Sequence, residues 1–223
     1  MNVRITFKSL ALCALMAAAS LTSCNNSNSS TTTTTTTPEK NPSMQSEGFY
    51  KGPQLDALTS NPNRLVVMET KQGTIKIQLF DKAAPKHVAN FVKLIKSGFY
   101  DGVTFHRIIP GFMIQGGDPN SKDDDLSNDG YGDPSLERVP AEFSQTLTHE
   151  RGILSAARTA DPNSASSQFF LMHKLSPHLD KQYSIYGQVV EGLAVVDKIV
   201  SLPKLSGDNP GKAAQITKVT ITE

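Results

Sequence analysis

The 223-residue sequence contains no tryptophan and only two cysteines, Cys13 and Cys24. Because both cysteines lie in the first 24 residues, the rest of the chain can form neither a disulfide framework nor a cysteine metal site. An excess of one charge is also missing, since 22 Lys and Arg against 21 Asp and Glu leave a formal net charge of +1. A nearly neutral chain has no strong field to gather nucleic acid, so no nucleic-acid partner is expected.

Motifs of the common catalytic and nucleotide-binding sites are missing as well. The sequence has no GxSxG, HExxH, Walker A or GxGxxG pattern, and its five histidines lack the i, i+4 spacing of a metal site. We therefore expect no cofactor and no metal. Residues 125–130 begin like a calcium-binding EF-hand loop, but its twelfth position is Leu136 and Glu137 comes one residue late. This mismatch favours a solvated acidic loop over a calcium site.

The amino-terminal region has the features of a secretory signal. Arg4 and Lys8 precede an apolar run over residues 10–19, which is too short to span a bilayer as a helix. The following Leu-Thr-Ser-Cys24 resembles the bacterial lipobox, in which the cysteine is lipidated. We expect residues 1–23 to be a lipoprotein signal peptide and Cys24 to anchor the protein to a bacterial membrane. The alternative is an ordinary signal peptide with an incidental cysteine.

The next segments predict a spacer and one folded domain. Residues 25–37 are only Asn, Ser and Thr, a composition that cannot bury a core. We expect residues 24–46 to be the lipidated cysteine with a disordered linker, although a glycosylated stalk is an alternative. Residues 47–63 are interpreted as an extension lying against the domain, and residues 64–223 as the domain itself, expected to be monomeric. We expect the protein to be extracytoplasmic and anchored on the periplasmic face or the cell surface, with the outer membrane favoured.

The domain sequence alternates short apolar segments with turn signals. Residues 64–70 and 74–80 show period-two alternation on either side of a turn, which predicts a hairpin. Further strands are predicted over residues 105–109, 112–115, 152–157, 168–172, 183–190 and 216–221, with helices after Pro85 and over residues 193–200. Because strands and helices do not alternate, the pattern favours a β-barrel or sandwich with outer helices over a parallel sheet.

The segment FHRIIPGFMIQGGD, residues 105–118, is the most informative part of the sequence. On a strand, Arg107, Met113 and Gln115 share parity and face the same way. The Pro-Gly break inside the segment would turn Phe112 onto that face as well. One cation, one amide and apolar groups would then share a surface. From the pattern alone, a reactive site and a barrel strand with a snorkelling arginine remain equal alternatives.

This segment resembles the signature of the cyclophilins, the peptidyl-prolyl cis-trans isomerases. Residues 152–170 (GILSAARTADPNSASSQFF) and 183–192 (YSIYGQVVEG) are similar to further family motifs, and the resemblance covers residues 64–223. It implies a mainly β fold, a closed eight-stranded antiparallel β-barrel capped by two α-helices. It also implies an isomerase (rotamase) that accelerates X-Pro rotation and assists protein folding. Together with the secretory signal, this predicts that its substrates are extracytoplasmic proteins. The alternative is a module that binds proline-containing polypeptides without turnover, or a chaperone.

The resemblance also implies roles for single residues. Arg107 would be the catalytic arginine, with Gln115 beside it. The residues that would bind the proline-containing polypeptide are Phe112, Met113, Ala157, Thr159, Ala160, Gln168, Phe170, His178, Leu179 and Tyr183. Two positions depart from the family pattern, because His178 stands where tryptophan is common and Tyr183 where histidine is common. Family members that bind cyclosporin well have that tryptophan, so weak cyclosporin binding is expected.

Overall fold

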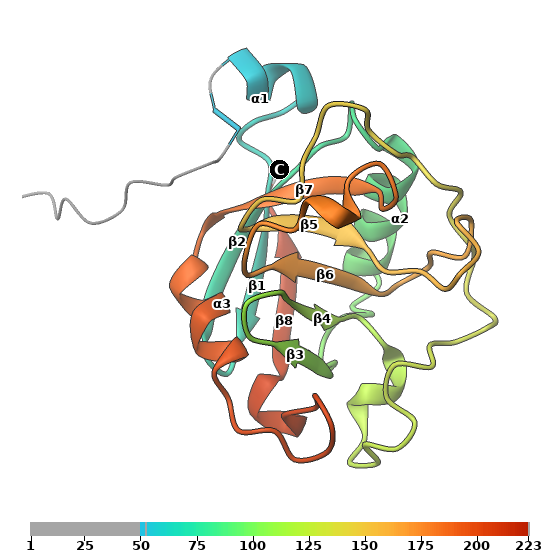
Figure 1. Cartoon of the computed structure of the whole chain (residues 1–223), viewed down its shortest axis with the longest axis vertical. Coiled ribbons are helices and arrows are strands. Elements are labelled where there is room, and N and C mark those ends of the chain that lie inside the picture. The colour runs from blue at the N-terminus through green and yellow to red at the C-terminus, as the bar shows by residue number, and fades with distance from the viewer. Residues whose placement is uncertain (1–49, 52, 223) are drawn as a thin grey trace, which may run out of the picture. The chain divides into compact units, whose positions relative to one another are not determined.

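The computed structural model describes residues 50, 51 and 53–222, which are mainly β. All eight strands join one antiparallel sheet, in the order β3-β4-β6-β5-β7-β2-β1-β8 (Figure 1). The strands are β1 (Leu65–Thr70), β2 (Gly73–Leu79), β3 (Arg107–Ile109), β4 (Met113–Gly116), β5 (Ile153–Ala156), β6 (Phe169–Met172), β7 (Ile185–Glu191) and β8 (Ile216–Ile221). Each strand predicted from the sequence is thus confirmed, with ends shifted by one or two residues.

The sheet curls but stays open, so the closed barrel expected from the sequence is wrong. Strands β3 and β8 form its two edges. A loop that contains Asp208, and not β8, lies along the outer edge of β3. The Ile108 N–H donates to the carbonyl oxygen of Asp208 at 2.9 Å. The chain before β3 approaches the start of β8, where the Gly102 N–H donates to Ile216 O at 2.9 Å.

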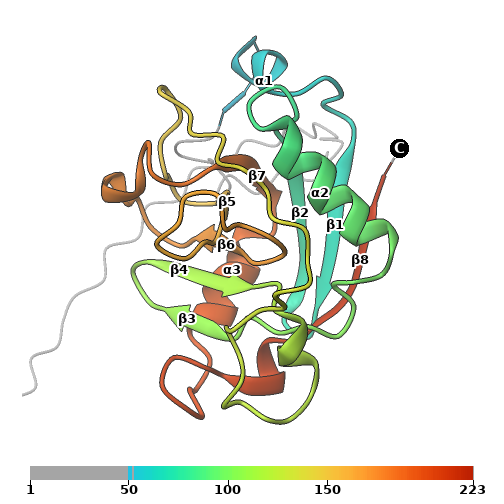
Figure 2. The same ribbon diagram turned by 90° about the vertical axis from the view of Figure 1, so that its right-hand side faces the viewer.

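Two helices cover the sheet, as the sequence predicts. Helix α2 (Pro85–Lys96) has proline in its first turn, where the missing N–H costs no hydrogen bond. Helix α3 (Leu193–Val200) follows Gly192, whose φ of 98° favours glycine. Figure 2 shows α2 crossing β1, β2 and β8, whereas α3 lies by the other side of these strands in Figure 1. A third helix, α1 (Pro53–Leu58), was not expected.

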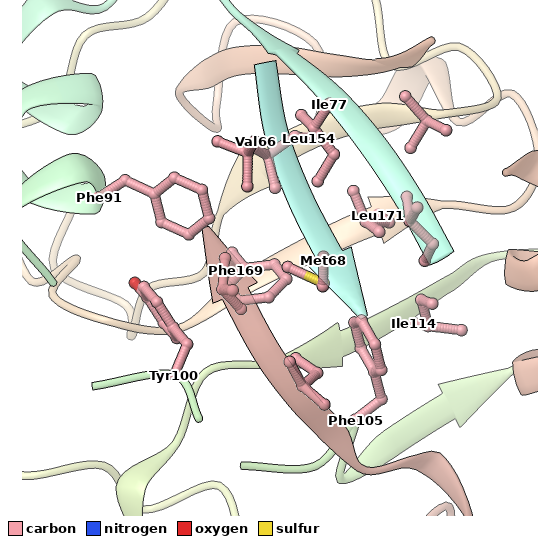
Figure 3. Close-up of a cluster of buried hydrophobic side chains, with 14 of the residues drawn as sticks. Val66, Met68, Ile77, Phe91, Tyr100, Phe105, Ile114, Leu154, Phe169 and Leu171 are labelled. Carbon is pink, nitrogen blue, oxygen red and sulfur yellow. The ribbon is translucent and has the colours of Figure 1, made fainter. Parts of the chain in front are cut away.

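Two hydrophobic clusters use opposite faces of the same strands. Ile114 of β4 and Leu171 of β6 point into the main core with Phe91 and Phe169 (Figure 3). Their alternate neighbours point to the other face, since side chains alternate along a strand. There Met113, Ile153, Phe170, Met172 and Ile185 form a second cluster with three residues from outside the strands, Phe80, Leu147 and Leu179. This second cluster is the floor on which the candidate site is built.

The segment before β1 packs on the second cluster. The ring of Tyr50 meets that of Phe80 edge-on, at 5.8 Å between centroids. The Tyr50 backbone N–H donates to the side-chain oxygen of Gln188 at 3.1 Å, and the Gln188 side-chain nitrogen donates to the Tyr50 carbonyl at 2.8 Å. Leu55 and Leu58 pack against the same cluster. The extension is therefore joined to the face of the sheet that carries the candidate site.

The expected signal peptide (residues 1–23) and the linker (residues 24–46), with Cys24, lie outside the described residues. In the described part of the chain, no helix combines the length and the apolar character needed to cross a bilayer. The lipid anchor therefore stays a prediction from the sequence.

Candidate active site

The β3–β4 hairpin places Arg107 and Gln115 opposite each other. The two residues are cross-strand partners in the antiparallel pair, and Arg107 Nη1 donates to Gln115 Oε1 at 3.4 Å. The turn between the strands contains Gly111 with φ of 81°, a value that favours glycine. The Arg107 side chain is 46% exposed, so its guanidinium can meet a ligand from solvent.

A chain of side-chain amides fixes the orientation of Gln115. Its Nε2 donates to Gln168 Oε1 at 2.9 Å, and Gln168 Nε2 donates to the Gly130 carbonyl at 3.0 Å. Since only the nitrogen of an amide donates, this chain of bonds leaves Gln115 Oε1 facing Arg107. The guanidinium is thus held from one side by a correctly oriented acceptor.

The buried carboxylate of Asp118 organises the loop that contains Gly130, the last acceptor in this series of hydrogen bonds. It is 0% exposed and accepts hydrogen bonds from the backbone N–H groups of Asn120, Gly130 and Gly132. Backbone donors of this kind satisfy a buried carboxylate. Asp118 thereby anchors Gly130, whose carbonyl orients Gln168.

A cavity of about 110 Å³ opens beside Arg107. For scale, a cavity that holds one water molecule has a volume of about 10–15 Å³ on the same measure, so this cavity accepts a small ring. It is lined by Arg107, Phe112, Met113, Gln115, Ala157, Arg158, Phe170, Leu179 and Tyr183. Because six of the nine lining residues are apolar or aromatic, and Arg107, Gln115 and Arg158 add polar groups, the site suits a small ring attached to a polar backbone.

The floor of the cavity is supported by a buried histidine. His149 is 0% exposed; its Nδ1 lies 2.8 Å from Asp180 Oδ1 and its Nε2 lies 3.1 Å from Ser155 Oγ. Burial lowers the pKa of His149, although Asp180 opposes the shift. The arrangement resembles a hydrolase triad, but Ser155 is 0% exposed and its hydroxyl also donates to a backbone carbonyl. The network therefore supports Phe170, on whose ring His149 is stacked, and offers no accessible nucleophile.

The carboxylates of the acidic loop serve local turns. Asp125 accepts from both the N–H and the hydroxyl of Ser127, at 2.9 and 2.6 Å. Asp133 binds Ser135 in the same way. Within residues 50–51 and 53–222, no three His, Cys, Asp or Glu side chains converge to hold a metal ion.

Residues 65–221 match the family model described as cyclophilin type peptidyl-prolyl cis-trans isomerase/CLD. The chain belongs to the cyclophilin family. This match spans the whole sheet and all residues that line the cavity beside Arg107.

Curated relatives and solved structures agree with this assignment. A probable peptidyl-prolyl cis-trans isomerase of Brucella suis is 40% identical over 169 residues, 74% of this chain and 86% of the relative. The isomerase of Synechococcus elongatus is 44% identical over 144 residues, 61% and 92% of the two chains. A Cryptosporidium parvum cyclophilin shares 32% identity with a TM-score of 0.62, over 71% of this chain and 99% of its own. The chain thus has the peptidyl-prolyl cis-trans isomerase activity of its family.

In this cyclophilin, most of the expected site residues surround the proline-sized cavity. Thr159 and Gln168 line an adjoining cavity of about 240 Å³ instead. His178 is exposed at the rim, where its ring stacks on Phe112 at 5.6 Å. Ala160 lines neither of these two cavities.

One lining residue, Arg158, contributes a side chain that was given no role from the sequence, where residues 157–160 were expected only to pair with the peptide through their backbone. Its guanidinium lies over the Tyr183 ring, 4.5 Å from the centroid, and donates to the Gln182 carbonyl from Nε and Nη2 at 3.1 and 2.9 Å. Its position next to Ala157 was the available signal. A cation–π contact between distant segments, however, cannot be read from spacing along the chain.

Proposed function

We propose that this cyclophilin isomerises X-Pro bonds of proteins outside the cytoplasm, with Arg107 as its catalytic residue and a lipid at Cys24 as its membrane anchor. One observation supports the catalytic role: of the two guanidinium groups that line the small cavity, that of Arg158 lies over the Tyr183 ring and donates to the Gln182 carbonyl, whereas that of Arg107 is positioned by Gln115. A second supports the substrate class, because the Cryptosporidium parvum cyclophilin was crystallised in the presence of the dipeptide Ala-Pro. The lipobox-like sequence ending at Cys24 supports the anchor.

The reaction requires stabilisation of a twisted amide. Resonance of the nitrogen lone pair creates a rotational barrier of about 18–20 kcal/mol. X-Pro bonds populate both the cis and the trans isomer, and because the barrier makes their exchange slow, it is slow enough to be a rate-limiting step in folding. In the twisted state the lone pair localises on nitrogen and can accept a hydrogen bond. Arg107 donates that bond without having to change its own protonation state. Because the bond forms only in the twisted state, it lowers the barrier instead of tightening substrate binding.

The other site residues hold the reacting groups in place. The proline ring occupies the cavity between Phe112, Met113 and Phe170, so the carbonyl group on the other side of the bond is the part that rotates. Gln115 accepts from Arg107 and restrains its guanidinium. No covalent bond breaks during the rotation, so the reaction requires neither a nucleophile nor a cofactor.

Exchange measurements on a proline peptide test this function directly. Catalytic amounts of the protein, added to an Ala-Ala-Pro-Ala peptide, are expected to produce cis–trans exchange visible by NMR. The uncatalysed bond exchanges over tens to hundreds of seconds. A protein that binds the peptide, shown by shift changes, without causing exchange would be a binding module, and the proposed function would be wrong.

A further inference from the structure

The wall of the proline cavity has a buried part and a partly exposed part. Met113, Phe170 and Leu179 belong to the buried second cluster, where neighbouring side chains hold them in place. Arg158 and Tyr183 also line the cavity, but both are only partly buried. Core packing alone therefore does not fix this part of the wall, and its position depends on specific contacts.

The Arg158 guanidinium makes those contacts. It lies over the Tyr183 ring, 4.5 Å from the centroid, and its Nε and Nη2 donate to the Gln182 carbonyl at 3.1 and 2.9 Å. Its Nη1 donates to the carbonyls of Thr159 and Ala160 at 2.8 and 3.4 Å. A guanidinium can make all these bonds at once, because its donors form a rigid planar fork. One side chain thus joins two segments of the wall that lie 24 residues apart in the sequence.

The Tyr183 ring is held between this guanidinium and two neighbouring rings. It meets the Phe170 ring at an interplanar angle of 80°, with 5.7 Å between centroids, and the His149 ring at 85° and 6.4 Å. Phe170 and His149 are stacked on each other, and both are buried, so they form a fixed support. The cation–π attraction of Arg158 holds the tyrosine ring beside that support. Without the guanidinium, the ring would lose this attraction and gain freedom to move outward.

The loop that leads to this tyrosine contains a strained residue. Lys181 has φ of 62°, and no other non-glycine residue in the described part of the chain has a positive φ. A lysine adopts this left-handed conformation at a cost in energy, which the surrounding contacts must offset. On one side of it, the Asp180 carboxylate accepts from the His149 N–H at 2.7 Å. On the other side, the Gln182 carbonyl accepts from Arg158, which therefore helps to hold the loop in its strained form.

We propose that Arg158 is a positioning residue, which holds one wall of the proline cavity in place and so selects the five-membered proline ring over larger rings. It acts through Tyr183 and Gln182, because its N–H groups are bound to carbonyls of the chain itself. A wall tied in this way does not move outward to accept an extra methylene. This selectivity rests on the proposed function, because the ring that fills the cavity belongs to the residue being isomerised.

Two peptides that differ by one methylene test the proposal with the full-length protein. Ala-Ala-Pro-Ala is compared by NMR exchange with its analogue that has six-membered pipecolic acid in place of proline. The wild type is expected to prefer proline by about 10- to 200-fold in kcat/KM, the usual effect of one methylene in a fitted pocket. Equal turnover of the two peptides by the wild type would overturn the proposal.

The variant Arg158→Ala should loosen this selection. Its preference for proline is expected to fall by about 2- to 5-fold, the effect of one exposed cation–π contact. KM for the proline peptide should rise more than kcat falls, because the wall holds the ring equally in the ground state and the transition state. Thermal unfolding shows whether the variant is folded. An unchanged preference in the folded variant would overturn the proposal.

Two further variants separate the position of the guanidinium from its charge. Arg158→Lys keeps a cation near the tyrosine ring but lacks the planar fork, so it should recover only part of the preference. Arg138→Ala removes the same charge from an exposed residue of the adjoining cavity that does not line the proline cavity, and should keep the preference. An equal loss in Arg138→Ala would indicate a general effect of charge and contradict the assignment. If Arg158→Ala fails to fold, Arg158→Lys decides, and a full wild-type preference in it would overturn the proposal.

Failure of the positioning role and failure of the proposed function give different results. A wild-type protein that turns over the proline peptide with a preference independent of Arg158 loses only the positioning role. A wild-type protein that turns over neither peptide loses the isomerase function itself.

Discussion

His178 stacks on Phe112 at the rim of the proline cavity, with 5.6 Å between ring centroids. In the variant His178→Trp, a larger ring covers the same rim and adds an indole N–H donor. We expect its affinity for cyclosporin to rise by about 30-fold, or about 2 kcal/mol, from added apolar contact and one hydrogen bond. Peptide turnover should change less, because His178 does not line the cavity itself. Inhibition titrations of the wild type and of His178→Trp with cyclosporin measure the difference. Equal sensitivity of the two proteins would show that position 178 does not form the rim of the proline cavity.

Strand parity was enough to predict that Arg107, Met113 and Gln115 share a face. It could not reveal Asp118, because the loop that this residue organises returns to it 12 and 14 residues later. It could not reveal His149 either, since its partner Asp180 lies 31 residues further along the chain. Groups that support a site from distant segments become visible only after folding.

At the scale of elements, the strands were predictable and the edges of the sheet were not. Period-two alternation located β1, β2 and β8, but it says nothing of what lies beside an edge strand. The backbone of Asp208 takes the outer edge of β3, and the sequence of that loop has no strand pattern. The six-residue helix α1 also escaped notice, because it is too short to show helical periodicity.

The extension before β1 is expected to stabilise the domain through Tyr50. This residue contacts Phe80 and exchanges two hydrogen bonds with Gln188 through its backbone, and its hydroxyl accepts from the Thr148 N–H at 3.2 Å. Tyr50→Ala should lower the free energy of unfolding by about 2 kcal/mol, less than a fully buried aromatic residue would. Urea denaturation measures this loss. The control Lys51→Ala, at an exposed position, should be neutral, and an unchanged stability of Tyr50→Ala would show that the extension does not pack as described.

The whole molecule is expected to lose stability in mild acid. Burial is the main cause that lowers the pKa of each of four histidines: His87, His106, His149 and His173. Their unfolded-state pKa is about 6.5, so below that pH the unfolded chain binds more protons than the folded chain. The stability is therefore fully present above about pH 6.5 and declines as the pH falls towards the lowered pKa values. Urea midpoints at pH 7.5 and 5.5 test this, and a higher midpoint at pH 5.5 would contradict it.

The proposed membrane location depends on one residue, Cys24, which lies outside the described structure. Cys24→Ser should prevent lipidation and release the protein from membranes, because the lipid requires a thiol and no cysteine follows. Membrane fractionation of cells that express each form measures the change, with Cys13→Ser as the matched control that keeps the anchor. A Cys24→Ser variant that stays in the membrane fraction would contradict the lipid anchor.

The catalytic role of Arg107 is the central claim of this account, and one comparison tests it. Arg107→Ala is expected to lower kcat/KM for proline peptides by about 100- to 1000-fold, or about 2.7–4 kcal/mol, the effect of losing one donor to a transition state. Because the side chain is 46% exposed, the thermal unfolding midpoint should stay close to that of the wild type. Arg107→Lys should recover only part of the loss, since an ammonium lacks the planar fork that Gln115 restrains. A folded Arg107→Ala protein with near-wild-type turnover would contradict the assigned mechanism.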